Sequence, residues 1–363
     1  LYLNACKELD FMVIGGLLFI LIMVLVLPFA VTKVEENLEI FLFIMGILAA
    51  VISGIMNMGL ILKALEEPVM IAAAVFIAGS LFFLLSQQFN HFMNKIFNII
   101  PLPITIFLII ALLGLLSSVI TAIVASIILV EIIFLLPLER EQKIIICILA
   151  CFSIGLGAAL TPIGEPLATI AISKLNQDFF YLLRLLGKFI IPGVVVVSLI
   201  GALYTVWILR PSENTTFTDW EEVENANNEI EEFRVEDTWR GIIVRALKVY
   251  LFVMALVFLG EGFQPLIDKY VLTLDYRILY WVNMISAVLD NATLTAAEIS
   301  IQMSTMQIEA ILMGLLISGG MLIPGNIPNI ISASKLRITS TEWAKFGVPF
   351  GLVMMAVYFV ILF

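Results

Sequence analysis

Long apolar stretches alternate with short polar connections along almost the whole chain. Each of these stretches has about the length of a membrane crossing or more, because a hydrocarbon core about 30 Å thick needs roughly 20 apolar residues of helix. They run over 11–31, 38–57, 68–86, 143–172, 187–209, 241–264, 305–334 and 342–363. This pattern predicts an all-α polytopic membrane protein.

Two further apolar segments, 101–136 and 270–303, are too long for a single crossing. As one continuous helix, the first would reach about 54 Å at a rise of about 1.5 Å per residue, well beyond the bilayer even with tilt. Each segment must therefore fold back, as a re-entrant hairpin or as two short crossings. Either arrangement returns the chain to the side from which it entered.

The order of these segments repeats in the two halves of the chain. A span, a folded-back segment, an interrupted span and a closing span follow one another in each half. Each unit crosses the membrane an odd number of times, so the second is upside down relative to the first, as in secondary transporters with a site at the midplane. The expected divisions are N-terminal scaffold helices over 1–67, a first inverted repeat over 68–209, an acidic solvent-exposed linker over 210–240 and a second inverted repeat over 241–363.

Composition supports a lipid environment and removes several functional classes. Hydrophobic residues make up 62% of the chain and charged residues only 13%, against about a quarter charged in a soluble domain. The linker carries ten acids and three arginines, and the net charge of −10 argues against a nucleic-acid partner. The chain has a single histidine, His91, and no nucleophile motif, so we expect neither enzymatic activity nor a cofactor.

Each repeat contains a proline- and glycine-rich interruption within a membrane span. Pro162, Gly164 and Pro166 interrupt the first, in the motif TPIGEP from Thr161, and the matching motif IPGNIP from Ile323 interrupts the second. Proline removes an N–H donor and unwinds helices, and unwound backbone is tolerated in a membrane only where it is buried in protein or lines a cavity. Freed carbonyl oxygens can coordinate a cation there, and half-helix N-termini can attract an anion.

Two carboxylates lie in these turns, Glu165 in the first interruption and Asp290 at the turn of the second folded-back segment. A carboxylate at membrane depth is costly and is a functional candidate by default. Two carboxylates near the midplane resist joint ionisation, so the pair can hold either protons or a cation. The other groups expected at this site are Thr161, Gly164, Asn291, Thr293 and Asn326, with Ser117, Ser118 and Thr121 in the equivalent turn of the first repeat.

Two other acids and a cysteine pair are left outside the predicted site. Glu131 and Glu298 lie nearer the membrane interface, where snorkelling or a structural hydrogen bond explains an acid as well as function does. Cys147 and Cys151 share a helix face without a third ligand nearby, so we interpret them as packing residues.

The motifs resemble those of the ion-transporter superfamily that contains the NhaD-type sodium/proton antiporters, the arsenite permeases and the divalent anion/sodium symporters. ALTPIGEPLAT (159–169) is similar to the NhaD-type stretch NLTPIGDPP, and SAVLDNATLTAA (286–297) is similar to S-x-V-x-D-N-x-P-L-T. By this resemblance Glu165 and Asp290 take the places of two family aspartates. The resemblance implies a scaffold domain, a mobile transport domain bearing the hairpins, and a homodimer. Glutamate at 165 and Leu167 in place of a second proline indicate an uncharacterised relative family.

These observations together predict a secondary active ion transporter, a sodium/proton antiporter working by alternating access. Sodium would be held by Asp290, Asn291 and Glu165 between the repeats, since hard cations favour oxygen ligands. No Lys or Arg lies in either turn to bind an anion. The alternative is a sodium-coupled symporter of a carboxylate or inorganic anion, bound at half-helix N-termini.

The Lys and Arg residues predict an orientation in the membrane. Twelve of them lie on one face and seven on the other, which makes the first face cytoplasmic and leaves both termini outside. We expect an integral protein of a prokaryotic inner membrane, surrounded by the lipid bilayer.

Overall fold

The computed structural model describes residues 2–31, 33–34, 37–69, 72–73, 76–77, 80, 84, 100–209, 239–266, 275–289, 291–299 and 303–363. All regular secondary structure within this part is helical. Here five helices are long and apolar enough to cross a bilayer. They are α5 (Leu102–Ile120), α7 (Arg140–Ala158), α9 (Tyr181–Ile208), α11 (Trp239–Gly262), which runs on towards the short α12 (Gln264–Leu266), and α17 (Ser340–Leu362). The chain is thus an all-α integral membrane protein, as the apolar pattern predicts.

Shorter helices occupy the segments that were predicted to be interrupted or folded back. Each of these segments is divided into two or more helices rather than forming one. The divisions fall within 101–136 and 143–172 in the first half and within 270–303 and 305–334 in the second. Besides the N-terminal helix α1 (Tyr2–Ala30), the remaining elements are short: α3 (Leu38–Ile52), α6 (Ala122–Leu135), α8 (Pro166–Leu175), α13 (Tyr276–Val282), the 3-10 helix η2 (Asn283–Ala287), α14 (Asn291–Glu298), α15 (Thr305–Gly319), the 3-10 helix η3 (Ile323–Gly325) and α16 (Ile327–Leu336). Most of the predicted span 68–86 and nearly all of the linker 210–240 lie outside the described residues.

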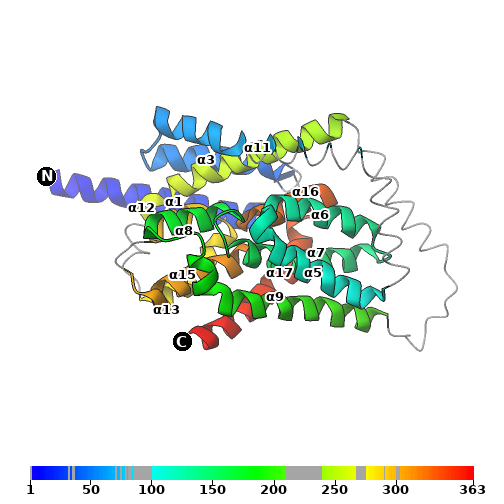
Figure 1. Ribbon diagram of the computed structural model, residues 1–363. Helices are drawn as coiled ribbons and strands as arrows, with labels where there is room; N and C mark the ends of the chain where they lie inside the picture. The colour runs from blue at the N-terminus through cyan, green and yellow to red at the C-terminus, as the bar shows by residue number, and fades with distance from the viewer. Residues whose placement is uncertain are drawn as a thin grey trace.

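The N-terminal helices pack with α11 along one edge of the molecule, where α3 and α11 lie side by side (Figure 1). The two helices approach closely because Gly46 has no side chain, and a Cβ there would lie 2.8 Å from the carbonyl oxygen of Ala255. Small residues let helix backbones meet in this way inside membranes. An ion pair between Lys248 and Glu39, 2.9 Å apart, joins the same helices at one end.

Two helices, α7 and α15, form the centre of the bundle. Fifteen residues of α7 and twelve of α15 are buried, so both helices are covered on every side rather than along one stripe. The helices α5 and α9 pack against α7 from the first half of the chain, and α13, η2 and α17 pack against α15 from the second. Each central helix ends at one of the predicted interruptions.

Close packing of α7 on α5 depends on Gly157. A Cβ at this position would lie 1.8 Å from the carbonyl oxygen of Gly114, which is backbone and cannot move aside. We therefore expect Gly157→Ala to lower the free energy of unfolding by at least about 2 kcal/mol through overpacking. The matched control is Gly15→Ala in α1, where a Cβ has no neighbour within 4 Å. Thermal unfolding in detergent should rank the control at or above wild type, and equal melting temperatures for the two variants would contradict this packing.

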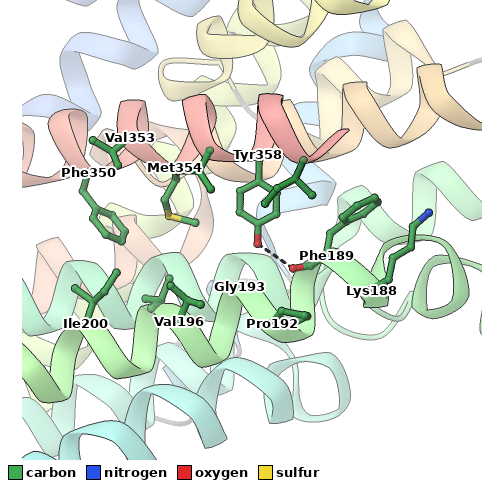
Figure 2. A pocket seen from close by; sticks show the side chains of 13 residues that line it. Lys188, Phe189, Pro192, Gly193, Val196, Ile200, Phe350, Val353, Met354 and Tyr358 are labelled. Carbon is green, nitrogen blue, oxygen red and sulfur yellow. Dashed lines mark hydrogen bonds between the residues drawn. The ribbon is translucent and has the colours of Figure 1, made fainter. Parts of the chain in front are cut away.

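A shallow apolar groove of about 220 Å³ lies between α9 and α17, away from the helix breaks (Figure 2). The hydroxyl of Tyr358 crosses it and donates a 2.9 Å hydrogen bond to the carbonyl oxygen of Phe189. That carbonyl lies one turn before Pro192, which lacks an N–H and disturbs the helical hydrogen bonds around it. Gly193 leaves room for the hydroxyl, since a Cβ there would lie 1.9 Å from it. The groove is therefore explained by helix packing.

Candidate functional site

The first interruption, residues 159–165 between α7 and α8, is tied directly to the break between α5 and α6. The N–H of Ala122, in the first turn of α6, donates a 2.8 Å hydrogen bond to the carbonyl oxygen of Gly164. The hydroxyl of Thr161 donates to the carbonyl oxygen of Ser118 at the end of α5. Helix ends leave such backbone groups without partners inside the helix. The backbone groups freed at the two helix breaks of the first half are therefore satisfied by hydrogen bonds between the breaks.

Thr121 lies at the break between α5 and α6 with a backbone conformation that is rare for a side-chain residue. Its φ is 75° and its ψ is 150°, a region populated almost only by glycine. The residue still acts as the N-cap of α6, because its hydroxyl accepts a 3.3 Å hydrogen bond from the N–H of Val124. Backbone strain of this kind concentrates at functional sites.

The strain at Thr121 can be tested by two substitutions with opposite expected effects. Thr121→Gly should raise the stability by about 1 kcal/mol, since relief of strain exceeds the entropy of a new glycine and the small loss of capping. Thr121→Ala keeps the strain and loses the cap, so it should lower the stability by about 1 kcal/mol. Melting temperatures in detergent check both changes. A Gly variant less stable than the Ala variant would show that the backbone at this position is not strained.

The second interruption, between α15 and α16, is held by asparagine side chains. Asn326 caps α16, its Oδ1 accepting a 3.1 Å hydrogen bond from the N–H of Asn329. The Nδ2 of Asn329 in turn donates to the carbonyl oxygens of Gly319 and Leu322, at 2.9 Å and 2.8 Å. These bonds satisfy carbonyl groups that the unwound segment leaves without helical partners. The break is therefore an ordered structure rather than a local kink.

The two interruptions have nearly the same backbone geometry. Glu165 precedes α8 with φ −156° and ψ 159°, and Asn326 precedes α16 with φ −154° and ψ 163°. The two half-helices also end alike, with left-handed residues at Asn176 (φ 51°, ψ 45°) and Arg337 (φ 49°, ψ 44°). The separation in sequence is the same for both pairs. The two half-helices therefore begin and end with nearly the same local backbone conformation.

This geometry corrects the alignment made from the motifs. Matching TPIGEP with IPGNIP from their first letters pairs Glu165 with Ile327, whereas the backbone pairs Glu165 with Asn326 and Gly164 with Gly325. Both glycines fit against the preceding helix end, where a Cβ would lie 2.0 Å from the carbonyl oxygen of Ala158 or 2.3 Å from that of Gly319. The prolines misled the alignment because one lies at the first and the other at the second position of its half-helix, and the first turn tolerates both.

Equivalent hydrogen bonds join the central helices to their neighbours. The hydroxyl of Ser117 donates to the carbonyl oxygen of Ile154 in α7 at 3.1 Å. In the second half, the hydroxyl of Ser286 donates to the carbonyl oxygen of Leu315 in α15 at 3.2 Å. These serines begin the matching sequences SSVITA (117–122) and SAVLDN (286–291) of the two halves, and their acceptors lie at matching positions of α7 and α15.

The second interruption lies against the central helix of the first half. The Nδ2 of Asn326 comes so close to Gly155 that a Cβ on this glycine would lie 2.9 Å from it. Gly155 is one helical turn before the end of α7, where the first interruption begins. The second interruption therefore contacts α7 within one helical turn of the place where the first interruption begins.

Amide oxygens without partners converge on the end of α15. Asn291, at the start of α14, is 4% exposed and lies against Gly319, where a Cβ would be 2.4 Å from its Nδ2. Asn329 binds the carbonyl of the same glycine. Among the described residues, neither Asn291 Oδ1 nor Asn329 Oδ1 has a hydrogen-bond partner. Buried acceptors are normally satisfied, so these two oxygens suit a cation.

The structure places most of the predicted site residues around these breaks. Thr161, Gly164, Glu165, Asn291 and Asn326 are buried at the interruptions, and Glu165 is 9% exposed. The hydroxyl of Ser118 donates to the carbonyl of Leu115 in its own helix, and that of Ser117 is shared between the carbonyls of Gly114 and Ile154, so both have a structural role there. Asp290 and the side chain of Thr293 lie outside the described residues.

Several buried polar residues at the same place were not predicted. Asn329 and Asn283 are fully buried, and so are Ser286 and Ser318. Asn329 directly follows the motif IPGNIP, three residues after Asn326, and this position was a usable signal. Glu298 was assigned to the interface, but it is 1% exposed and bonded to Asn283, so the snorkelling explanation is wrong for it. The burial of Asn283 depends on tertiary packing and leaves no mark in the sequence.

The cysteines pack as predicted. Both are fully buried, and Cys151 donates to the hydroxyl oxygen of Ser332 on α16, at 3.3 Å. Among the described residues, no group of three His, Cys, Asp or Glu side chains comes together to hold a metal ion.

The comparisons with known proteins place the chain in a family without giving it a function. No curated protein matches it. A family model described as DUF1646, protein of unknown function, matches residues 14–363. Because this match covers nearly the whole chain, the protein belongs to the DUF1646 family.

Proposed function

We propose that this protein is a secondary active ion transporter, a sodium/proton antiporter that works by alternating access. The observation that carries the proposal is the approach of two helix interruptions of nearly the same geometry, within one helical turn of α7, at the centre of the bundle. The side chains of Glu165, Asn291 and Asn329, which lie at these interruptions or against them, are buried. Broken helices that present oxygens at mid-membrane are typical of ion sites in secondary transporters.

The repeated geometry supports an inverted repeat, with units over 68–209 and 241–363. Equal backbone angles before α8 and α16 and equivalent serine bonds into α7 and α15 fit two copies of one unit. Inverted repeats allow the same site to open to either face when one unit exchanges conformation with the other. In this scheme α1 and α3, with α11 packed on α3, belong to a scaffold, and the broken helices move against it.

A cation suits this centre better than an anion. The N-terminus of a helix favours negative charge, but here the N-terminus of α16 already holds an oxygen of the chain itself, and an acidic residue directly precedes α8. Glu165 is the residue before α8, and Asn326 Oδ1 accepts from the first turn of α16. A sodium-coupled carboxylate symporter is the alternative, and sodium-dependent uptake of a labelled dicarboxylate that Glu165→Gln leaves intact would favour it.

Sodium binding can be tested at a single oxygen that the fold does not use. Asn291→Ala removes an amide oxygen without a hydrogen-bond partner in the described structure. Because no bond to this oxygen is lost, the change should cost the sodium-free protein little stability. It should, however, abolish the stabilisation by sodium, which for a bound ligand at about 100 times its dissociation constant amounts to about 2.7 kcal/mol.

Thermal unfolding with and without sodium, at constant ionic strength with choline, measures this difference. The control is Asn37→Ala at the exposed start of α3, whose amide donates to the carbonyl of Lys33 on the surface. We expect sodium to raise the melting temperature of wild type and of the control, but not that of Asn291→Ala. An equal sodium response in all three proteins would remove Asn291 from the site.

A further inference from the structure

A buried acid outside the proposed sodium site lies on the inner face of α14. Asn291, Thr295 and Glu298 follow one another at helical spacing on this face, and all three are buried. The hydroxyl of Thr295 donates a 2.8 Å bond back to the carbonyl of Asn291. Glu298 lies about two turns beyond the sodium-site end of the helix and is 1% exposed.

Among the residues that the structure describes, Glu298 has a polar partner but no cationic one. The Nδ2 of Asn283 donates a 3.0 Å hydrogen bond to its Oε2. Within the described residues, its Oε1 has no partner, and the Oδ1 of Asn283 has none either. Both unpartnered atoms are oxygens that accept hydrogen bonds. A single hydrogen atom between Oε1 of Glu298 and Oδ1 of Asn283 would satisfy both oxygens.

Two other acids inside the bundle have a basic side chain beside them. Glu131 forms an ion pair with Lys335, and Glu309 lies 2.8 Å from Lys188. No such pair is found for Glu298 in the part of the chain that the structure describes, although isolated charges are seldom buried. This contrast separates Glu298 from acids whose burial a neighbouring cation explains.

The charges on the elements around α14 are accounted for elsewhere. The helix packs against α8, α15 and α11. Their described charged side chains are Lys174 at the exposed end of α8, Glu309 on α15, and Arg240, Lys248 and Glu261 on α11. Glu309, Lys248 and Glu261 pair with Lys188, Glu39 and Lys63, and Arg240 and Lys174 are exposed. On α13, the helix that directly precedes Asn283, Arg277 and the N-cap residue Asp275 are also exposed.

We propose that Glu298 and Asn283 form a proton-binding site, separate from the sodium site at Asn291. A proton on Oε1 of Glu298 donates to Oδ1 of Asn283, while Nδ2 of Asn283 continues to donate to Oε2. The acid and the amide then form a reciprocal pair in which each makes two hydrogen bonds. The neutral acid also avoids the cost of an unpaired charge inside the membrane. No other bond has to form or break.

A short chain of hydrogen bonds connects this pair to the sodium site. The hydroxyl of Ser318 lies 2.8 Å from the carbonyl oxygen of Asn283, 2.6 Å from that of Gly314 and 2.5 Å from the hydroxyl of Ser286, so its one hydrogen is shared among these neighbours. Ser318 directly precedes Gly319, the residue against which Asn291 and Asn329 lie. When Glu298 loses its proton, the amide of Asn283 faces a charged carboxylate. A resulting shift of Asn283 would move Ser318, and with it the end of α15. As far as it links this proton to sodium, the inference rests on the proposed function.

Infrared spectroscopy of the purified protein tests the site without any transport measurement. A buried protonated carboxylic acid gives a C=O stretching band, distinct from that of carboxylates, which shifts in D₂O and under [¹³C]glutamate labelling. We expect wild type to show this band near neutral pH and Glu298→Gln to lose one such component. Glu309→Gln is the matched control, since Glu309 pairs with Lys188 and should contribute none.

The outcomes separate the two proposals. A wild-type protein without a protonated glutamate band, or a band unchanged in Glu298→Gln, would overturn the proton site. If Glu298→Gln does not fold, Glu298→Asp serves instead, because the band should then lose its sensitivity to [¹³C]glutamate, and retained sensitivity would equally overturn the site. A band that behaves as expected in a protein that moves no sodium would leave the proton site standing and remove the antiporter.

Discussion

Glu165→Gln is expected to uncouple sodium binding from protons. Glutamine keeps the size of the side chain before α8 but can neither ionise nor release a proton. In wild type, competition between sodium and protons should weaken sodium binding on acidification by a factor of roughly 5–150, the usual range of coupling between two ligands. In the variant this dependence on pH should flatten. Isothermal titration of sodium at several pH values measures it directly.

The control for Glu165 is Glu141→Gln, an acid in the exposed first turn of α7. It should bind sodium with the affinity and the pH dependence of wild type. By the sequence argument Asp290→Asn should lose coupling as well. A Glu165 variant with a wild-type pH profile would show that the first interruption does not take part in the exchange.

The second large effect is expected at the buried ion pair between the two halves of the chain. Lys335 on α16 pairs with Glu131 on α6, with side chains that are only 8% and 16% exposed. Removing one member leaves the other charge buried and unpaired, so Lys335→Met should destabilise the protein by roughly 3–5 kcal/mol. The difference in stability between this variant and wild type should become smaller as the pH is lowered, because Glu131 can then take up a proton.

The double variant Glu131→Gln/Lys335→Met shows whether the unpaired charge is the cause. With both charges gone the stability should return close to that of wild type, since apolar or neutral replacements of buried pairs are often tolerated. The exposed pair Arg184–Asp178 provides a comparison, where Arg184→Met should leave the stability close to that of wild type. Thermal unfolding in detergent ranks all the variants, and an equally unstable double variant would contradict the charge argument.

The class of fold and the places of the helix breaks could be predicted from sequence because each has a strong local signature. Apolar length sets the membrane helices, and the clusters around Pro162 and Pro324 end α7 and α15 near where they were expected to. The break at Thr121 within 101–136 follows from length alone. These features depend on properties of a few neighbouring residues, which a single sequence contains in full.

The polar interior could not be predicted, because it depends on which helices come together. Asn283 and Glu298 are fifteen positions apart and meet only through the packing of η2 with α14. Asn291 and Asn329 meet at Gly319 because α15 ends between them. The correct pairing of Glu165 with Asn326 also required backbone angles, since proline positions alone suggested a register one residue away.

The most direct test is sodium-driven proton movement in proteoliposomes. The purified protein is reconstituted with a pH-sensitive dye inside the vesicles, and sodium or lithium is added outside. If the interruptions around Glu165 and Asn326 form an exchange site, entering sodium should expel protons, and the internal pH should rise in wild type but not in Glu165→Gln. Internal pH that stays unchanged on addition of either ion, with protein shown to be folded in the vesicles, would contradict sodium/proton exchange.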